Sequence, residues 1–159
     1  MDIDKLTNAL NNDMNESIMG LTSRKILELN LKIIKELHLD RETTLLYLQK
    51  LKDYRYIDEI CDLKYGAFIK WIPITDPTNI PLNYAGIVCD IKLTNTGTLI
   101  TCKNFMHRHY TFNMEECLIF QKLSAEEKVL LSALDHLSNE VPSKQLDSED
   151  DDDYSDDSD

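Results

Sequence analysis

Two cysteines and two histidines lie close together in the segment CKNFMHRHYTFNMEEC, residues 102–117. Thiolates and imidazoles are the ligands that structural zinc prefers, usually as two close pairs that converge on a tetrahedron. Here the spacing is C-x4-H-x-H-x7-C, in which only the histidines form a close pair. The candidate metal ligands are therefore Cys102, His107, His109 and Cys117, but their spacing matches no common zinc motif.

The same segment has an interpretation without a metal. Free cysteine behaves as a small hydrophobic residue, and Cys102 and Cys117 lie in apolar-rich stretches that read as neighbouring strands. His107, Arg108 and His109 are typical of a solvated strand edge. We therefore interpret the segment as strands joined by a turn, and we expect neither a metal nor a cofactor.

Catalytic motifs are absent from the sequence. There is no G-x-S-x-G, P-loop, G-x-G-x-x-G or H-E-x-x-H pattern. Four glycines leave little material for loops that cradle phosphates, and nothing marks one cysteine as an activated nucleophile. We expect that the protein is not an enzyme.

A face for nucleic acid or a protein partner is a further candidate site. Residues 64–123 carry six basic residues against four acidic ones, together with eight of the twelve aromatic residues. Small barrels that bind single strands combine aromatic platforms with positive charge. The alternative is that most of the aromatic side chains fill the core. The candidate face consists of Lys70, Trp71, Lys103, Arg108 and Tyr110.

The spacing of apolar residues predicts an α+β scaffold for these side chains. Residues 1–20 read as a polar arm or a short helix, and apolar positions at helical spacing predict a helical hairpin over 21–60. The period then changes to two, which predicts five short antiparallel strands over 64–123, closed into a small SH3-like barrel without exposed edges. A C-terminal helix is expected over 124–140.

The helical hairpin also has an interpretation as a helix-turn-helix. Its second helix would begin at Arg41 and would face phosphates with Lys50, Lys52 and Arg55. Acidic neighbours such as Glu42 oppose this reading. A hairpin packed on the barrel explains the same pattern without DNA.

The net charge of −12 is concentrated near the C-terminus. Residues 146–159 hold nine acidic residues and no basic ones, which leaves 20 acidic and 17 basic residues in the remainder. We predict a disordered acidic tail over 141–159. It would attract basic partners, or would mimic nucleic acid and compete for a basic groove. Ser148, which acidic residues follow, resembles a site for acid-directed kinases of the casein kinase 2 kind.

The expected location is intracellular, in the cytoplasm or the nucleus. The first residues are polar where a signal peptide would be apolar. The four cysteines show no paired short spacing, which favours free thiols in a reducing compartment. No apolar run approaches the roughly 18 residues of a membrane span, so we expect a soluble protein with no membrane partner.

The stretch YGAFIKWIP…YAGIVCDI…LITCKN…CLIFQK resembles small β-modules in uncharacterised proteins of large DNA viruses of the mimivirus group. The abundance of Asn, Ile, Lys and Asp and the ending DDDDYSDDSD are similar too. The resemblance implies a viral protein that acts inside an infected cell or is packaged in the virion. It includes no catalytic or ligand motif and assigns no functional residue.

The sequence thus predicts a non-enzymatic interaction module, or adaptor, for another protein with a basic surface. In this reading the acidic tail adds charge attraction. The alternative is a nucleic-acid-associated accessory factor in transcription or packaging. That factor would bind through the barrel face or through the helix-turn-helix.

Overall fold

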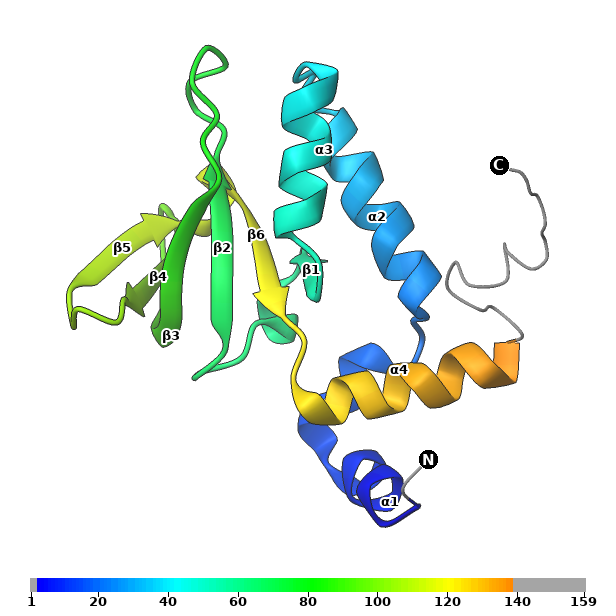
Figure 1. Ribbon diagram of the computed structural model, residues 1–159. Coiled ribbons are helices and arrows are strands. Elements are labelled where there is room, and N and C mark those ends of the chain that lie inside the picture. The colour runs from blue at the N-terminus through cyan, green and yellow to red at the C-terminus, as the bar shows by residue number, and fades with distance from the viewer. Residues whose placement is uncertain (1–2, 139–159) are drawn as a thin grey trace. The chain divides into compact units, whose positions relative to one another are not determined.

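A computed structural model describes residues 3–138 of the chain (Figure 1). Within these residues the class is α+β, as predicted, with four α-helices and one antiparallel sheet. The described residues form two compact units: residues 3–28 group with residues 125–138, and Leu29–Ser124 form the second unit. The predicted tail over 141–159, with Ser148, lies outside the described residues.

The first unit is helical. Helix α1 (Ile3–Asn11) and a 3-10 helix, η1 (Asp13–Ile18), occupy the region predicted as a polar arm or a short helix. The first residues of helix α2 (Ser23–Lys35) and all of helix α4 (Ala125–Ser138) complete it. Its buried apolar side chains are those of Ala9, Ile18, Ile26, Leu130 and Leu131.

Carboxylates of α4 accept hydrogen bonds from side-chain amides and from one backbone N–H group of this unit. Glu126 accepts hydrogen bonds from the side-chain amides of Asn12 and Asn15, at 2.8 and 3.1 Å. Asp135 accepts the backbone N–H of Ser23 at 2.8 Å. A carboxylate at this place accepts from an N–H group at the start of α2 that has no partner within the helix. Its negative charge also interacts favourably with the positive end of the helix dipole.

In the second unit, helix α3 (Arg41–Lys50) follows the remainder of α2. The Asp40 carboxylate accepts the backbone N–H of Thr43 at 2.7 Å, which makes Asp40 the N-cap. Hydrogen bonds from the backbone and side chain of Thr43 lower the pKa of Asp40. The cap explains why the chain starts a new helix here, as the sequence predicts.

Strand β1 (Tyr54–Ile57) ends the helical part earlier than predicted. The buried Asn30 of α2 donates to the carbonyl of Tyr54 at 2.9 Å and accepts from the N–H of Tyr56 at 3.0 Å. On its other side β1 pairs with β6 (Cys117–Lys122). The helical hairpin therefore stops before residue 60, because aromatic and β-branched residues at 54–57 complete a sheet instead.

The sheet has six strands in the order β1-β6-β2-β3-β4-β5. The five predicted strands are all present, and β1 is the sixth. Strands β1 and β5 lie at the two margins and do not pair with each other in the described chain, so the predicted closed five-stranded SH3-like barrel is wrong. The remaining strands are β2 (Phe68–Pro73), β3 (Asn83–Thr94), β4 (Gly97–Lys103) and β5 (His109–Asn113).

Both faces of the sheet carry a core. The face that we call the inner face is covered by residues of the strands and of their connections, including Ile57, Leu63, Ile69, Val88, Ile100, Cys102, Phe112 and Ile119. The opposite face, which we call the helix face, packs against α2 and α3 near β1, β6 and β2 (Figure 1). Its buried residues are Ile34, Leu51, Tyr54, Ile72 and Phe120.

A β-bulge changes the expected faces of β3. Simple alternation places Ile87, Cys89 and Ile91 on one face. In the structure the register shifts between Val88 and Asp90, so Val88 and Ile91 both meet the inner core while Cys89 is exposed. The extra residue of a bulge reverses the alternation beyond it.

Candidate nucleic-acid interface

A groove of about 450 Å³ lies where the end of α3 meets the helix face of the sheet. Lys50 comes from the last turn of α3, Lys70 from β2 and Tyr84 from β3. Tyr54 of β1 forms its buried wall. We call this site the lysine groove; it is lined by Lys50, Tyr54, Lys70, Leu82, Asn83 and Tyr84.

Lys70 is the most constrained of these cations. Its Nζ donates to the carbonyl of Lys50 at 2.6 Å and lies 4.7 Å from the centre of the Tyr54 ring. Burial lowers the pKa of Lys70, and the charges of Lys50 and Lys122 lower it further. Lys70 is thus repelled by both neighbouring cations, and in residues 3–138 none of the three lysines forms an ion pair.

An exposed aromatic pair borders the groove. The rings of Phe68 and Tyr84 stack with centroids 6.3 Å apart and an interplanar angle of 18°. Their side chains are 40% and 44% exposed. The Nζ of Lys122 lies 5.6 Å from the centre of the Phe68 ring, which brings a third cation to the same place.

Positive charge continues across the helix face toward β5. Directly opposite residues of antiparallel strands share a face. Phe68 lies opposite Ile87, Ile87 opposite Lys103, and Lys103 opposite His109. Lys103 and His109 therefore extend the row that begins at Phe68.

The structure divides the predicted face between two sides of the sheet. Lys70 and Lys103 are on the helix face, but Trp71 is on the inner face, where it stacks on Phe112 at 4.5 Å and packs against the core. Tyr110 lies opposite the buried Cys102 and shares the inner face. Arg108 belongs to the β4–β5 loop. The alternative interpretation of Trp71 as a core residue is the one that the structure supports.

The face predicted from the sequence omits Phe68, Tyr84 and Lys122, and the sequence names Lys50 only as part of the helix-turn-helix alternative. A signal for Phe68 was present, because residues 68 and 70 share the parity of an alternating strand whereas residue 71 does not. Tyr84 could not be found in this way, since the β2–β3 register shifts between Ile69 and Lys70. Lys50 reaches the sheet only through tertiary packing.

The four candidate zinc ligands do not converge. Cys102 is fully buried in the inner core, whereas His109 is exposed and lies on the helix face. In the part of the chain that the structure describes, no three of these residues bring ligand atoms within 4.8 Å of one another. Cys102 lies opposite Tyr110 and His109 lies opposite Lys103. Because adjacent positions of a strand point to opposite faces, Cys102 and His109 are on different sides of the sheet.

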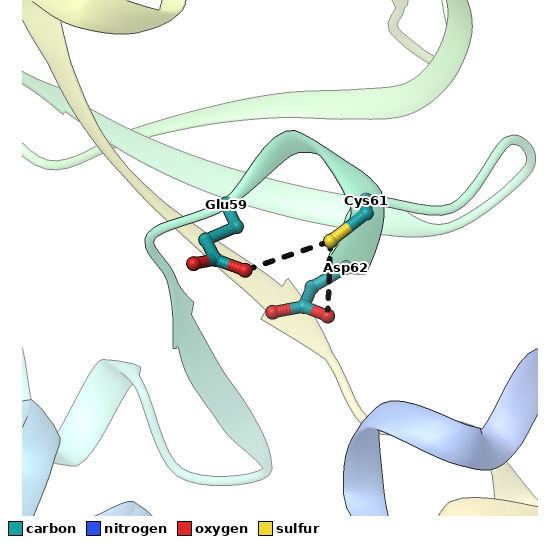
Figure 2. Close-up of side chains that lie close together, drawn as sticks. All are labelled: Glu59, Cys61 and Asp62. Atoms are coloured by element: carbon teal, nitrogen blue, oxygen red, sulfur yellow. Dashed lines mark hydrogen bonds between the residues drawn. The ribbon is translucent and has the colours of Figure 1, made fainter.

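A different group of potential ligands occurs in the 3-10 helix η2 (Ile60–Asp62) (Figure 2). The Cys61 thiol lies 3.6 Å from a Glu59 carboxylate oxygen and 3.9 Å from one of Asp62. Burial of the thiol and the charge of Asp62 raise the pKa of Cys61, with a smaller effect from Glu59. The thiol therefore donates hydrogen bonds to the carboxylates, an arrangement that an acidic turn adopts without a metal.

A second hollow, of about 320 Å³, has acidic walls. Asp58 follows β1, and Glu115 belongs to the 3-10 helix η3 (Met114–Glu116). Glu115 accepts the N–H of Thr98 at 2.9 Å. Apolar side chains, including Ile74 and Leu118, complete the lining. Carboxylates beside apolar walls suit a basic side chain with a long aliphatic stem.

Comparison with protein-family models, curated proteins and solved structures finds no match for this chain. The resemblance to β-modules of large DNA viruses therefore stays a prediction. Among the described helices, none combines the length and the apolar character needed to cross a bilayer.

Proposed function

We propose that this protein binds single-stranded nucleic acid along the helix face of its sheet. The observation that carries the proposal is the lysine groove, lined by Lys50 and Lys70, with the exposed pair Phe68 and Tyr84 and the cation of Lys122 at its border. Within residues 3–138 none of the three lysines has an ionic partner. Proteins that bind single strands without sequence preference combine a positive groove with aromatic platforms for the bases.

A phosphate in the groove would offset the repulsion that Lys50 and Lys122 exert on Lys70. Bases on either side of that phosphate would meet the exposed rings of Tyr84 and Phe68. Lys70 has a structural role as well, because its hydrogen bond to Lys50 caps the negative end of α3. Lys50 and Lys122 are therefore the better residues with which to test binding.

The test is the affinity of the full-length chain for a fluorescent oligonucleotide across a salt series. Replacing both Lys50 and Lys122 with Met is expected to weaken binding and to reduce the slope of log K against log salt by about 1.4, since each phosphate contact to a single strand contributes about 0.7. The matched control replaces the exposed Lys25 and Lys35 of α2, which lie outside the groove and off the sheet, and so removes the same charge.

Two outcomes would contradict the proposal. One is the absence of binding by the unaltered protein even at low salt. The other is an equal loss in the control variant, which would mean that net charge alone, and not the groove, determines affinity.

The adaptor role predicted from the sequence is a second candidate. The acidic hollow beside Asp58 and Glu115 favours it, because it suits a basic side chain of a protein partner. A lysine-rich peptide is the probe for that role, with its affinity compared in the presence and absence of residues 146–159.

A further inference from the structure

The loop between β4 and β5 presents apolar side chains to solvent. Phe105 is 83% exposed and Met106 is 65% exposed. Exposed aromatic and thioether side chains at the end of a hairpin bury nothing in the fold itself. Such residues mark contact sites more often than scattered surface residues do.

Hydrogen bonds hold this loop in one conformation. The Asn104 side-chain oxygen accepts the N–H groups of Met106 and Arg108, at 2.9 and 3.0 Å. The backbone N–H of Asn104 donates to the carbonyl of Arg108 at 3.0 Å. His107 adopts a left-handed conformation, with φ of 64°, which is uncommon outside glycine but which histidine accepts more readily than most residues. Because the loop is preorganised, a ligand would not have to order it.

The loop and the strands beside it carry positive charge only. No acidic residue occurs between Asp90 and Glu115. Lys103 precedes the loop, Arg108 lies within it, and His109 follows. A complementary partner would therefore carry anionic groups for Lys103 and Arg108 and an apolar or aromatic group for Phe105, which lies between them in the sequence.

We infer that Phe105 is a second stacking platform and that the strand bound in the lysine groove continues to this loop. The inference rests on the proposed function. From Lys122 of β6 to His109 of β5, the row on the helix face crosses four strand spacings, or about 19 Å. That span suits the smallest sites, of about four nucleotides, that single-strand binders use. The row joins the groove to the base of the loop without an acidic residue.

The arrangement specifies the class of nucleic acid. A ring stacks on a base only where the face of the base is open, as it is in single strands, loops and unpaired ends. In a duplex the bases stack on one another, and a side chain inserts only if the helix is unstacked and kinked at additional cost. The ligand is therefore an unpaired strand.

The test compares binding of a labelled 12-nucleotide single strand and of the same length as a duplex. Phe105→Ala is expected to weaken single-strand binding about tenfold, within the range that base–aromatic stacking supplies. Phe105→Tyr keeps the ring and should bind as the unaltered protein does. Leu93→Ala, which removes another exposed apolar side chain on β3, is the matched control and should leave affinity unchanged.

The outcomes separate this inference from the proposed function. If the unaltered protein binds and Phe105→Ala binds equally well, the inference fails and the groove stands. If the unaltered protein binds no oligonucleotide, both fail. If duplex binds as tightly as single strand, the ligand class is wrong. If Phe105→Ala instead loses sedimentation with phosphatidylserine-containing vesicles while oligonucleotide binding is retained, the loop contacts a lipid surface and the inference is overturned.

Discussion

Cys102 is a fully buried thiol near the end of β4. Burial raises its pKa from 9.0 to about 12, and the charge of Cys89 adds to the effect. The folded protein therefore keeps a proton that the unfolded chain would release at lower pH. This difference makes stability depend on pH in the alkaline range.

The sign of that dependence gives a prediction. Above pH 9 the unfolded chain loses the Cys102 proton while the folded chain retains it, so rising pH favours unfolding. The stability of the unaltered protein should fall relative to Cys102→Ala by up to about 1.4 kcal/mol per pH unit. Urea unfolding with a reductant present, from pH 8 to pH 10.5, measures the difference.

The exposed thiol of Cys89 supplies the control. Cys89→Ala should retain most of the fall seen in the unaltered protein, because it leaves the burial of Cys102, the larger cause of the raised pKa, in place. Lys70, whose pKa is lowered, titrates with the opposite sign, but it is present in every variant and cancels in the comparison. Parallel profiles for the unaltered protein and Cys102→Ala would contradict the assignment.

For single residues, the sequence predicts whether a side chain is buried better than it predicts on which face of the sheet the side chain lies. The apolar surroundings of Cys102 predict a small buried side chain, and it is one. The alternation of β2 separates Lys70 from Trp71, yet both were placed on one candidate face, because charge and aromatic content were counted without regard to the pleat. Parity alone would have removed Trp71.

Strand β3 depends on a glycine where it crosses β4. Gly86 has φ of 101°, and a Cβ added there would collide with the backbone of Lys103 and Asn104. Gly66 also has a positive φ, of 82°, but nothing lies within 4 Å of a Cβ added to it. The two glycines thus share a backbone requirement and differ in their surroundings.

Substituting each glycine separates those two effects. Gly66→Ala should cost about 1 kcal/mol of unfolding free energy, because only the backbone is strained. Gly86→Ala should cost about 3 kcal/mol or more, since β4 must also move away. Urea or thermal unfolding gives both values. Similar costs for the two variants would show that the close approach of β3 and β4 has no energetic weight.

Periodicity identifies most elements because local spacing is enough to distinguish a helix from a strand. It fails where a neighbour distant in sequence decides the structure. The residues at 54–57 favour a strand, but they form β1 only because Asn30 and strand β6, which lie far away in the sequence, bind them. Periodicity also fails to predict the register shifts of β2 and β3, because the partner strand sets the register.

For the whole molecule, the charge of −12 contrasts with the positive lysine groove. Most of the excess negative charge belongs to residues 146–159. A segment of that sign lowers the local concentration of nucleic acid and raises that of basic proteins. The two candidate functions therefore respond to the segment in opposite directions.

Deleting residues 146–159 should strengthen oligonucleotide binding and weaken binding of a lysine-rich peptide. The change should fade as salt rises, because the screening length shortens from about 10 Å at 0.1 M to about 3 Å at 1 M. Fluorescence anisotropy with both probes measures it. A variant in which the acids of this segment are replaced by Asn and Ser controls for length. Unchanged affinity for both probes would deny the segment any role.

The two edge strands of the sheet differ in how readily they could pair with a second copy of the chain. At β1, the amide of Asn30 occupies outward backbone groups much as another strand would. Strand β5 pairs with β4 alone in the described chain, so its outer row of N–H and C=O groups can accept a ribbon from a second copy. Arg108 is exposed and lies beside that margin, and a charged side chain at a sheet edge opposes such pairing.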